Sequence, residues 1–133
     1  MTVYTSYFSK IKRLPDDFIF FSIAGKPPEG YIIGKNGRFR SLPMFYPKYS
    51  WWSEWHKKFG KNPESNESID FYTKLYKETV LKFVDFGIVS DTLLNCGGTP
   101  CLLCYERPEK FCHRHLVSRF LVDHGLNSME FIA

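Results

Sequence analysis

Residues 101–125 read CLLCYERPEKFCHRHLVSRFLVDHG, and this stretch decides the predicted fold. The apolar run at 101–105 is typical of a buried strand. Amphipathic residues at 112–124 predict a helix, and Gly125 provides its end. A buried strand that leads through a short polar loop into a helix is the repeating unit of an α/β fold.

The flanking sequence extends the same alternation. Strands are predicted at 3–8, 18–24 and 129–132, because these segments are rich in β-branched and aromatic residues. A helix that begins after 65–68 and ends at Gly87 and a short helix at 91–95 complete the pattern. We therefore expect one domain over residues 1–133, with a layered α/β fold and a mainly parallel central sheet flanked by helices.

The segment 31–63 interrupts this pattern. It carries glycines, prolines and all three tryptophans, with little periodicity. We expect a long insertion with one helical turn near 50–60, and long loops of this kind are often functional.

Composition excludes several classes of protein. The chain has 133 residues, 44% of them hydrophobic and 24% charged, which is typical of a globular domain rather than a disordered one. Its apolar runs are too short to cross a membrane, and its N-terminus lacks the layout of a signal peptide. We expect a cytoplasmic protein with reduced thiols and no membrane partner.

The predicted strand and helix bring reactive side chains to one place. Alternation puts Cys104 and Glu106 on one face of the strand and Cys101 on the other. Glu106 falls at the carboxyl end, the sheet edge where α/β proteins bind ligands. Beyond the loop, the first turn of the helix carries Cys112, His113 and Arg114 in succession.

This arrangement predicts a site for an anionic ligand, such as a nucleotide or a nucleic-acid phosphate. The helix N-terminus offers free N–H groups, to which Arg114 adds donors, and Cys104 would line the same site. The partial positive charge at the helix N-terminus also favours a thiolate, which makes Cys112 a candidate nucleophile. Glu106 could act as a base or orient His113 or Arg114.

The basic first half of the chain supports an anionic partner. Residues 1–60 hold ten Lys and Arg against four Asp and Glu, whereas residues 61–133 hold eight against ten. Lys26, Arg38 and Arg40 are candidate phosphate contacts, and Trp51 and Trp52 are candidate stacking platforms for bases. The alternative for the two tryptophans is burial as a lid over the core.

Three alternatives compete with the anion site. Zinc could bind Cys101, Cys104, Cys112 and His115 at a plausible spacing, although Cys101 and Cys104 should face opposite ways. Cys104 and Cys112 could instead form a redox pair, for which their Cα atoms should lie within ~7 Å.

A non-enzymatic protein is the third alternative. It would bind a protein partner through the aromatic segment 31–63, and the cysteine–histidine cluster would be structural. Cys96 and Cys101 fit a role as core residues, and His113 could be a packed histidine with a satisfied ring nitrogen.

The same residues resemble the domain-of-unknown-function family 488 (DUF488), small bacterial and phage α/β proteins. The resemblance rests on the first two strands, on Tyr72 and Tyr76 and, above all, on the Cys-x-Glu strand at 104–106 followed by Cys-His-Arg at 112–114. It implies an α/β domain in which Cys104, Glu106, Cys112, His113 and Arg114 gather in one site. It implies no particular reaction. We expect no cofactor, with zinc as the alternative given above.

Overall fold

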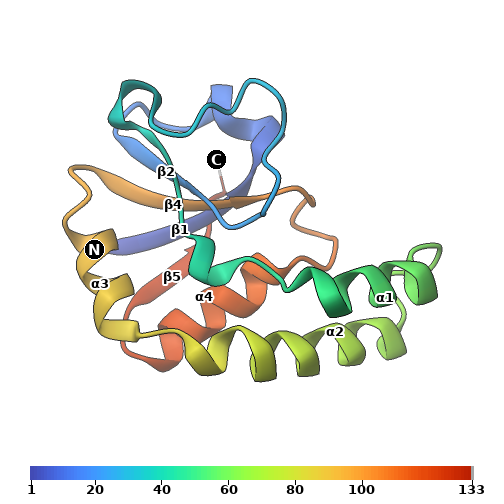
Figure 1. The fold of residues 1–133 in the computed structure, drawn as a ribbon. Helices are drawn as coiled ribbons and strands as arrows, with labels where there is room; N and C mark the ends of the chain where they lie inside the picture. The colour runs from blue at the N-terminus through green and yellow to red at the C-terminus, as the bar shows by residue number, and fades with distance from the viewer. Residues whose placement is uncertain (133) are drawn as a thin grey trace.

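The computed structural model describes residues 1–132 and confirms the α/β class (Figure 1). Its five strands form one sheet in the order β3-β2-β4-β1-β5, and every neighbouring pair is parallel. The strands are β1 (Thr2–Tyr7), β2 (Phe18–Ser22), β3 (Phe39–Ser41), β4 (Thr99–Cys104) and β5 (Asn127–Glu130). The helices are α1 (Tyr49–Phe59), α2 (Asn66–Thr79), α3 (Phe86–Leu94) and α4 (His113–Asp123). None of the helices in residues 1–132 is long and apolar enough to cross a membrane.

The segments that connect the strands cover both faces of the sheet. The segments after β1 and β2 cross one face, the upper one in Figure 1, while α1, α2 and α4 lie below the sheet. Neighbouring strands β2 and β4 are thus followed by segments that go to opposite faces. Such a switch point opens a crevice at the carboxyl ends of the strands, where α/β proteins bind their ligands.

Two apolar cores flank the sheet. Leu102 and Cys104 point into the larger core, between the sheet and the helices. Cys101 and Leu103 point into the smaller one, beneath the connection after β1 and the loop after β2. The alternation predicted for 101–105 is confirmed, because a β-strand turns successive side chains to opposite faces.

The predicted helix up to Gly87 is wrong in its second half. Helix α2 ends at Thr79, and a 3₁₀ turn (Leu81–Phe83) separates it from α3. Asp85 is the reason for the new start, because its carboxylate accepts a hydrogen bond from the Ile88 N–H at 3.2 Å and caps α3. The helix predicted at 91–95 is the last part of α3.

The segment 31–63 is more regular than predicted. It supplies β3, which pairs with β2 at the edge of the sheet, and its helical turn is the 11-residue helix α1. Three residues are too few to show a period of two, so the sequence gives no signal for β3.

Gly98 lies where the chain enters β4, and a larger residue there should destabilise the fold. A Cβ atom at this position would overlap the backbone oxygen of Asp17. We expect Gly98→Ala to lower the free energy of unfolding by about 1–3 kcal/mol, measured by urea denaturation. Gly25→Ala is the control, since its Cβ would meet only the Tyr46 ring at an ordinary 3.7 Å. Equal stability of the two variants would contradict this account.

Candidate functional site

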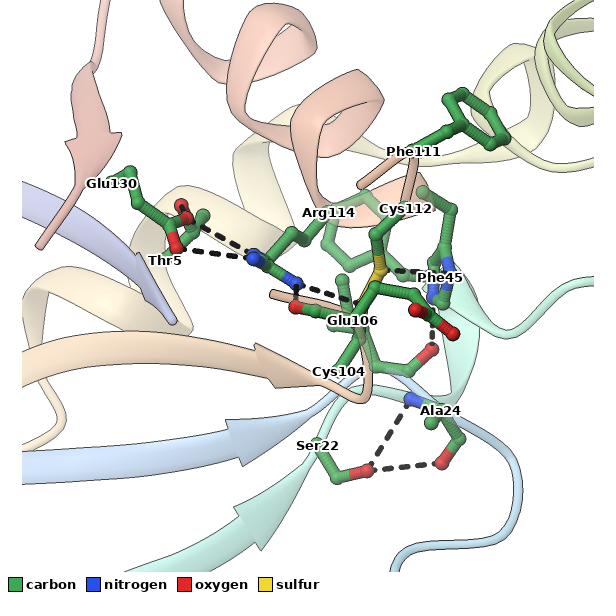
Figure 2. The surroundings of a disulfide bond; sticks show 12 residues. Thr5, Ser22, Ala24, Phe45, Cys104, Glu106, Phe111, Cys112, Arg114 and Glu130 are labelled. Atoms are coloured by element: carbon green, nitrogen blue, oxygen red, sulfur yellow. Dashed lines mark hydrogen bonds and ion pairs between the residues drawn. A yellow bond between two sulfur atoms is a disulfide. The ribbon is translucent and has the colours of Figure 1, made fainter. Parts of the chain in front are cut away.

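The site lies at the carboxyl edge of the sheet, where β4 ends and α4 begins (Figure 2). Cys104 is the last residue of β4, and Cys112 directly precedes α4. A disulfide joins the two, with their Cα atoms 7.3 Å apart, slightly beyond the ~7 Å expected for such a bridge. The expectation of four reduced thiols therefore differs from the structure, which leaves only Cys96 and Cys101 free among its cysteines.

The four zinc ligands proposed from their spacing do not assemble. Cys101 is fully buried in the core on the opposite face of the sheet from Cys104. Burial raises the pKa of the Cys101 thiol well above its usual range, which fits a core residue. Cys104 and Cys112 instead lie beside His113, and the potential ligand atoms of these three residues are all within 4.8 Å of one another.

His113 is a buried histidine at the start of α4. Its Nε2 donates a hydrogen bond to the Ile23 carbonyl at 2.7 Å, which leaves Nδ1 as an acceptor, 4.0 Å from the Cys112 sulfur. The Tyr76 ring packs against the imidazole, with centroids 5.5 Å apart. Burial lowers the pKa of His113 to about 4, although the hydrogen bond to Ile23 opposes the shift. The imidazole is therefore neutral at physiological pH.

This burial makes the stability of the chain depend on pH. Between pH 6.5 and about 4 the unfolded chain protonates His113 while the folded chain does not, so protonation favours unfolding. His115, whose pKa burial also lowers, acts in the same direction. We expect the unfolding free energy to fall by about 2 kcal/mol from pH 7 to pH 5, measured by urea denaturation. NMR should show no titration of the His113 ring above pH 5, and a midpoint near 6.5 would contradict the burial.

Arg114 is fully buried, and its guanidinium is occupied by protein groups. It forms an ion pair with Glu130, with Nε and Nη2 at 3.0 and 3.1 Å from the two carboxylate oxygens. Nη1 donates to the backbone carbonyl of Glu106 and lies 3.4 Å from the Cys104 sulfur. The Thr5 hydroxyl donates to Glu130 at 2.6 Å and completes the cluster (Figure 2). Arg114 thus ties β4, β5 and the start of α4 together.

Glu106 contributes to the cluster through its backbone rather than through its carboxylate. The residue is exposed, and it is the carbonyl that accepts the bond from Arg114. The groups that orient the two candidate side chains are Glu130 for Arg114 and the Ile23 carbonyl for His113. Sequence reasoning missed both: the prediction puts Glu130 inside a strand at 129–132, whereas it is the last residue of the observed β5.

The predicted basic contacts lie apart from Cys104 and Cys112 or face solvent. Arg38 donates to the carbonyls of Pro15 and Phe18, at the amino end of β2. Arg40 donates to carbonyls too, those of Gly37 and Cys96. Lys26 is exposed, and its backbone carbonyl accepts a bond from the Tyr105 hydroxyl at the rim of the site. Of the three, only Lys26 is close to the sheet edge that carries the cysteines.

The two tryptophans pack rather than present open faces. Trp51 is buried, and its Nε1 donates to the Thr79 hydroxyl at 2.7 Å. Trp52 is half-buried and stacks on His56, with ring centroids 5.0 Å apart. This placement matches the predicted alternative of a lid over the core. His115, from the proposed zinc set, is half-buried, and its Nε2 has no hydrogen-bond partner within residues 1–132.

Comparison with protein-family models, with the curated proteins and with the solved structures gave no match. The resemblance to family 488 therefore stays a prediction that rests on the residues quoted for it.

Proposed function

We propose that this protein carries out reversible thiol–disulfide chemistry at Cys104 and Cys112. The observation that supports it is the pairing of the two sulfurs at the carboxyl edge of the sheet, beside the switch point between β2 and β4. A structural disulfide needs no such position, whereas a reactive one needs contact with a partner at the surface. Both cysteines also belong to the residues through which the chain resembles family 488.

The exposure of the two cysteines assigns their roles. Cys112 is 6% exposed and Cys104 only 1%, so Cys112 is the thiol that a partner reaches first. The Cys112 thiolate attacks a partner disulfide, forms a mixed disulfide and releases one partner thiolate. The Cys104 thiolate then attacks the Cys112 sulfur and releases the second. One protein dithiol and one disulfide thus become one protein disulfide and two thiols.

Two features of the site favour the thiolates. Arg114 Nη1 lies 3.4 Å from the Cys104 sulfur, and a nearby cation stabilises the charged form of a thiol. Cys112 occupies the N-cap of α4, where the helix dipole has the same effect. His113 contributes little as a base, because its pKa near 4 makes the neutral imidazole a weak proton acceptor.

Trapping the mixed disulfide tests this proposal. The reduced chain is incubated with glutathione disulfide and analysed by mass spectrometry, and the wild type should lose two hydrogens per chain. Cys104→Ser should instead retain one glutathione on Cys112, and Cys112→Ser should form no Cys104–Cys112 disulfide. Cys101→Ala is the matched control and should behave as the wild type. A Cys104→Ser chain that retains no glutathione would overturn the proposal.

The anionic ligand predicted from the sequence stays a second prediction. Because Arg114 is paired with Glu130, a nucleotide or nucleic-acid phosphate would have to meet the backbone N–H groups of the first turn of α4. Binding should then weaken steeply as salt rises, as measured with labelled oligonucleotides. A protein partner at segment 31–63 stays a further prediction, because Tyr31, Phe45 and Trp51 are buried whereas Ile32, Ile33 and Tyr49 are exposed.

A further inference from the structure

We propose that the reduced form of this chain binds one zinc ion through the sulfurs of Cys104 and Cys112 and through Nδ1 of His113. This site differs from the four ligands predicted by spacing, since it omits Cys101 and His115. The inference rests on the proposed function only in that the Cys104–Cys112 bond must be reducible.

The spacing of the three atoms fits a tetrahedral ion. Zinc lies about 2.3 Å from sulfur and 2.0–2.1 Å from nitrogen, which places tetrahedral ligand atoms roughly 3.5–3.8 Å apart. The Cys112 sulfur and His113 Nδ1 are already 4.0 Å apart, and all three candidate atoms lie within 4.8 Å of one another. Reduction frees the two sulfurs to separate, so small side-chain rotations bring the three atoms to these distances.

The hydrogen bonds of His113 prepare it as a ligand. A carbonyl oxygen only accepts, so the bond to Ile23 places the ring proton on Nε2. Nδ1 then carries a lone pair, on the side of the ring that faces the cysteines. Metal-binding histidines commonly donate their other ring N–H to a carbonyl in this way, which fixes both the tautomer and the orientation of the ring.

The charges around the cysteines balance with a divalent ion. Arg114 and Glu130 neutralise each other, so two thiolates would leave two negative charges in a buried site. A divalent cation removes that excess, whereas in the metal-free chain the first thiolate opposes ionisation of the second thiol. The Arg114 N–H that lies 3.4 Å from the Cys104 sulfur remains available as a hydrogen bond to a zinc-bound thiolate.

Three protein ligands leave a fourth position open. Two cysteines and one histidine with an open position are typical of a catalytic zinc site rather than a closed structural one. Here the open position would take a water molecule or an anionic ligand at the carboxyl edge of the sheet, next to the exposed loop at 105–110. Because disulfide sulfurs do not bind zinc as thiolates do, oxidation of the pair by a partner disulfide, which becomes two thiols, would release the ion.

Zinc binding to the reduced and the oxidised chain provides the test. Full-length protein is reduced without oxygen, freed of metal and titrated with zinc against a chromophoric chelator. We expect one zinc per reduced chain, a higher Tm with zinc, and no binding to the disulfide form. Cobalt in place of zinc should give the sulfur-to-metal charge-transfer absorption of a four-coordinate site. A reduced chain that binds no zinc, or an oxidised chain that binds it equally well, overturns the proposal.

Matched variants identify the ligands. Cys112→Ser should roughly halve the charge-transfer band, because one of the two thiolate ligands is lost. His113→Gln should weaken zinc binding at least roughly tenfold, as loss of a supporting contact alone can do. Cys101→Ala and His115→Ala should bind as the wild type. If these two variants weaken binding and His113→Gln does not, the proposed ligand set is wrong.

Failure of the proposed redox function can be distinguished from failure of the zinc proposal. If only the redox function is wrong, the reduced chain still binds zinc, but Cys104→Ser retains no glutathione. Circular dichroism of each variant separates loss of a ligand from loss of the fold.

Discussion

Replacing Arg114 with methionine should lower the free energy of unfolding by about 3–5 kcal/mol. The Arg114 side chain is fully buried and the Glu130 side chain is 16% exposed, so the variant leaves Glu130 mostly buried without its counter-charge. It also removes the donor to the Glu106 carbonyl and the N–H beside the Cys104 sulfur. Methionine keeps much of the length of arginine, so the loss reports charge and hydrogen bonds more than an empty volume. Urea denaturation of the reduced chains measures the effect.

The same helix provides a control for this prediction. Arg119 also pairs with an acidic residue, Asp123, at 3.4 Å, but both side chains are more than half exposed. Arg119→Met should change stability by less than about 0.5 kcal/mol, because surface ion pairs contribute little. The double variant Arg114→Met with Glu130→Met should recover part of the loss, since no charge then stays buried alone. A loss of less than 1 kcal/mol in Arg114→Met would contradict the burial argument.

The parts of the fold that the sequence predicted correctly depend on local pattern. The run at 101–105 alternates in the structure as expected, because side chains on a strand change face at every residue. Helix α4 ends where Gly125 takes a positive φ of 97°, which glycine adopts at little cost. Both features are encoded within a few neighbouring residues.

The missed features depend on strand order. Glu130 meets Arg114 because β5 lies beside β1 at the edge of the sheet, and nothing near residue 130 in sequence indicates that neighbour. The Ile23 carbonyl meets His113 because β2 lies next to β4. Spacing along the chain suggested Cys101 and His115 as metal ligands, but the faces of β4 separate Cys101 from Cys104. A site formed by residues from several strands can therefore be predicted only in part from the sequence, before the strand order is known.

Truncating Tyr76 to alanine should lower the free energy of unfolding by about 3–5 kcal/mol, the usual range for a large aromatic residue lost from a core. Its side chain is fully buried, and the ring packs against both Tyr72 and His113. Its hydroxyl donates to the Phe45 carbonyl at 2.7 Å in the core under the sheet. The variant therefore loses apolar contacts, leaves a cavity and leaves the buried Phe45 carbonyl without its donor.

Tyr76→Phe separates these effects, because it keeps the ring and removes only the hydroxyl. It should cost about 1–3 kcal/mol, the range for a buried acceptor left without its donor. Tyr49→Ala is the control, since Tyr49 is 75% exposed and should contribute little. We expect the loss of unfolding free energy to be largest for Tyr76→Ala, smaller for Tyr76→Phe and smallest for Tyr49→Ala. An equal loss for the two Tyr76 variants would show that the ring contributes nothing. Because the ring forms one wall around His113, Tyr76→Ala should also raise the pKa of that histidine toward its ordinary value by admitting water, as followed by NMR.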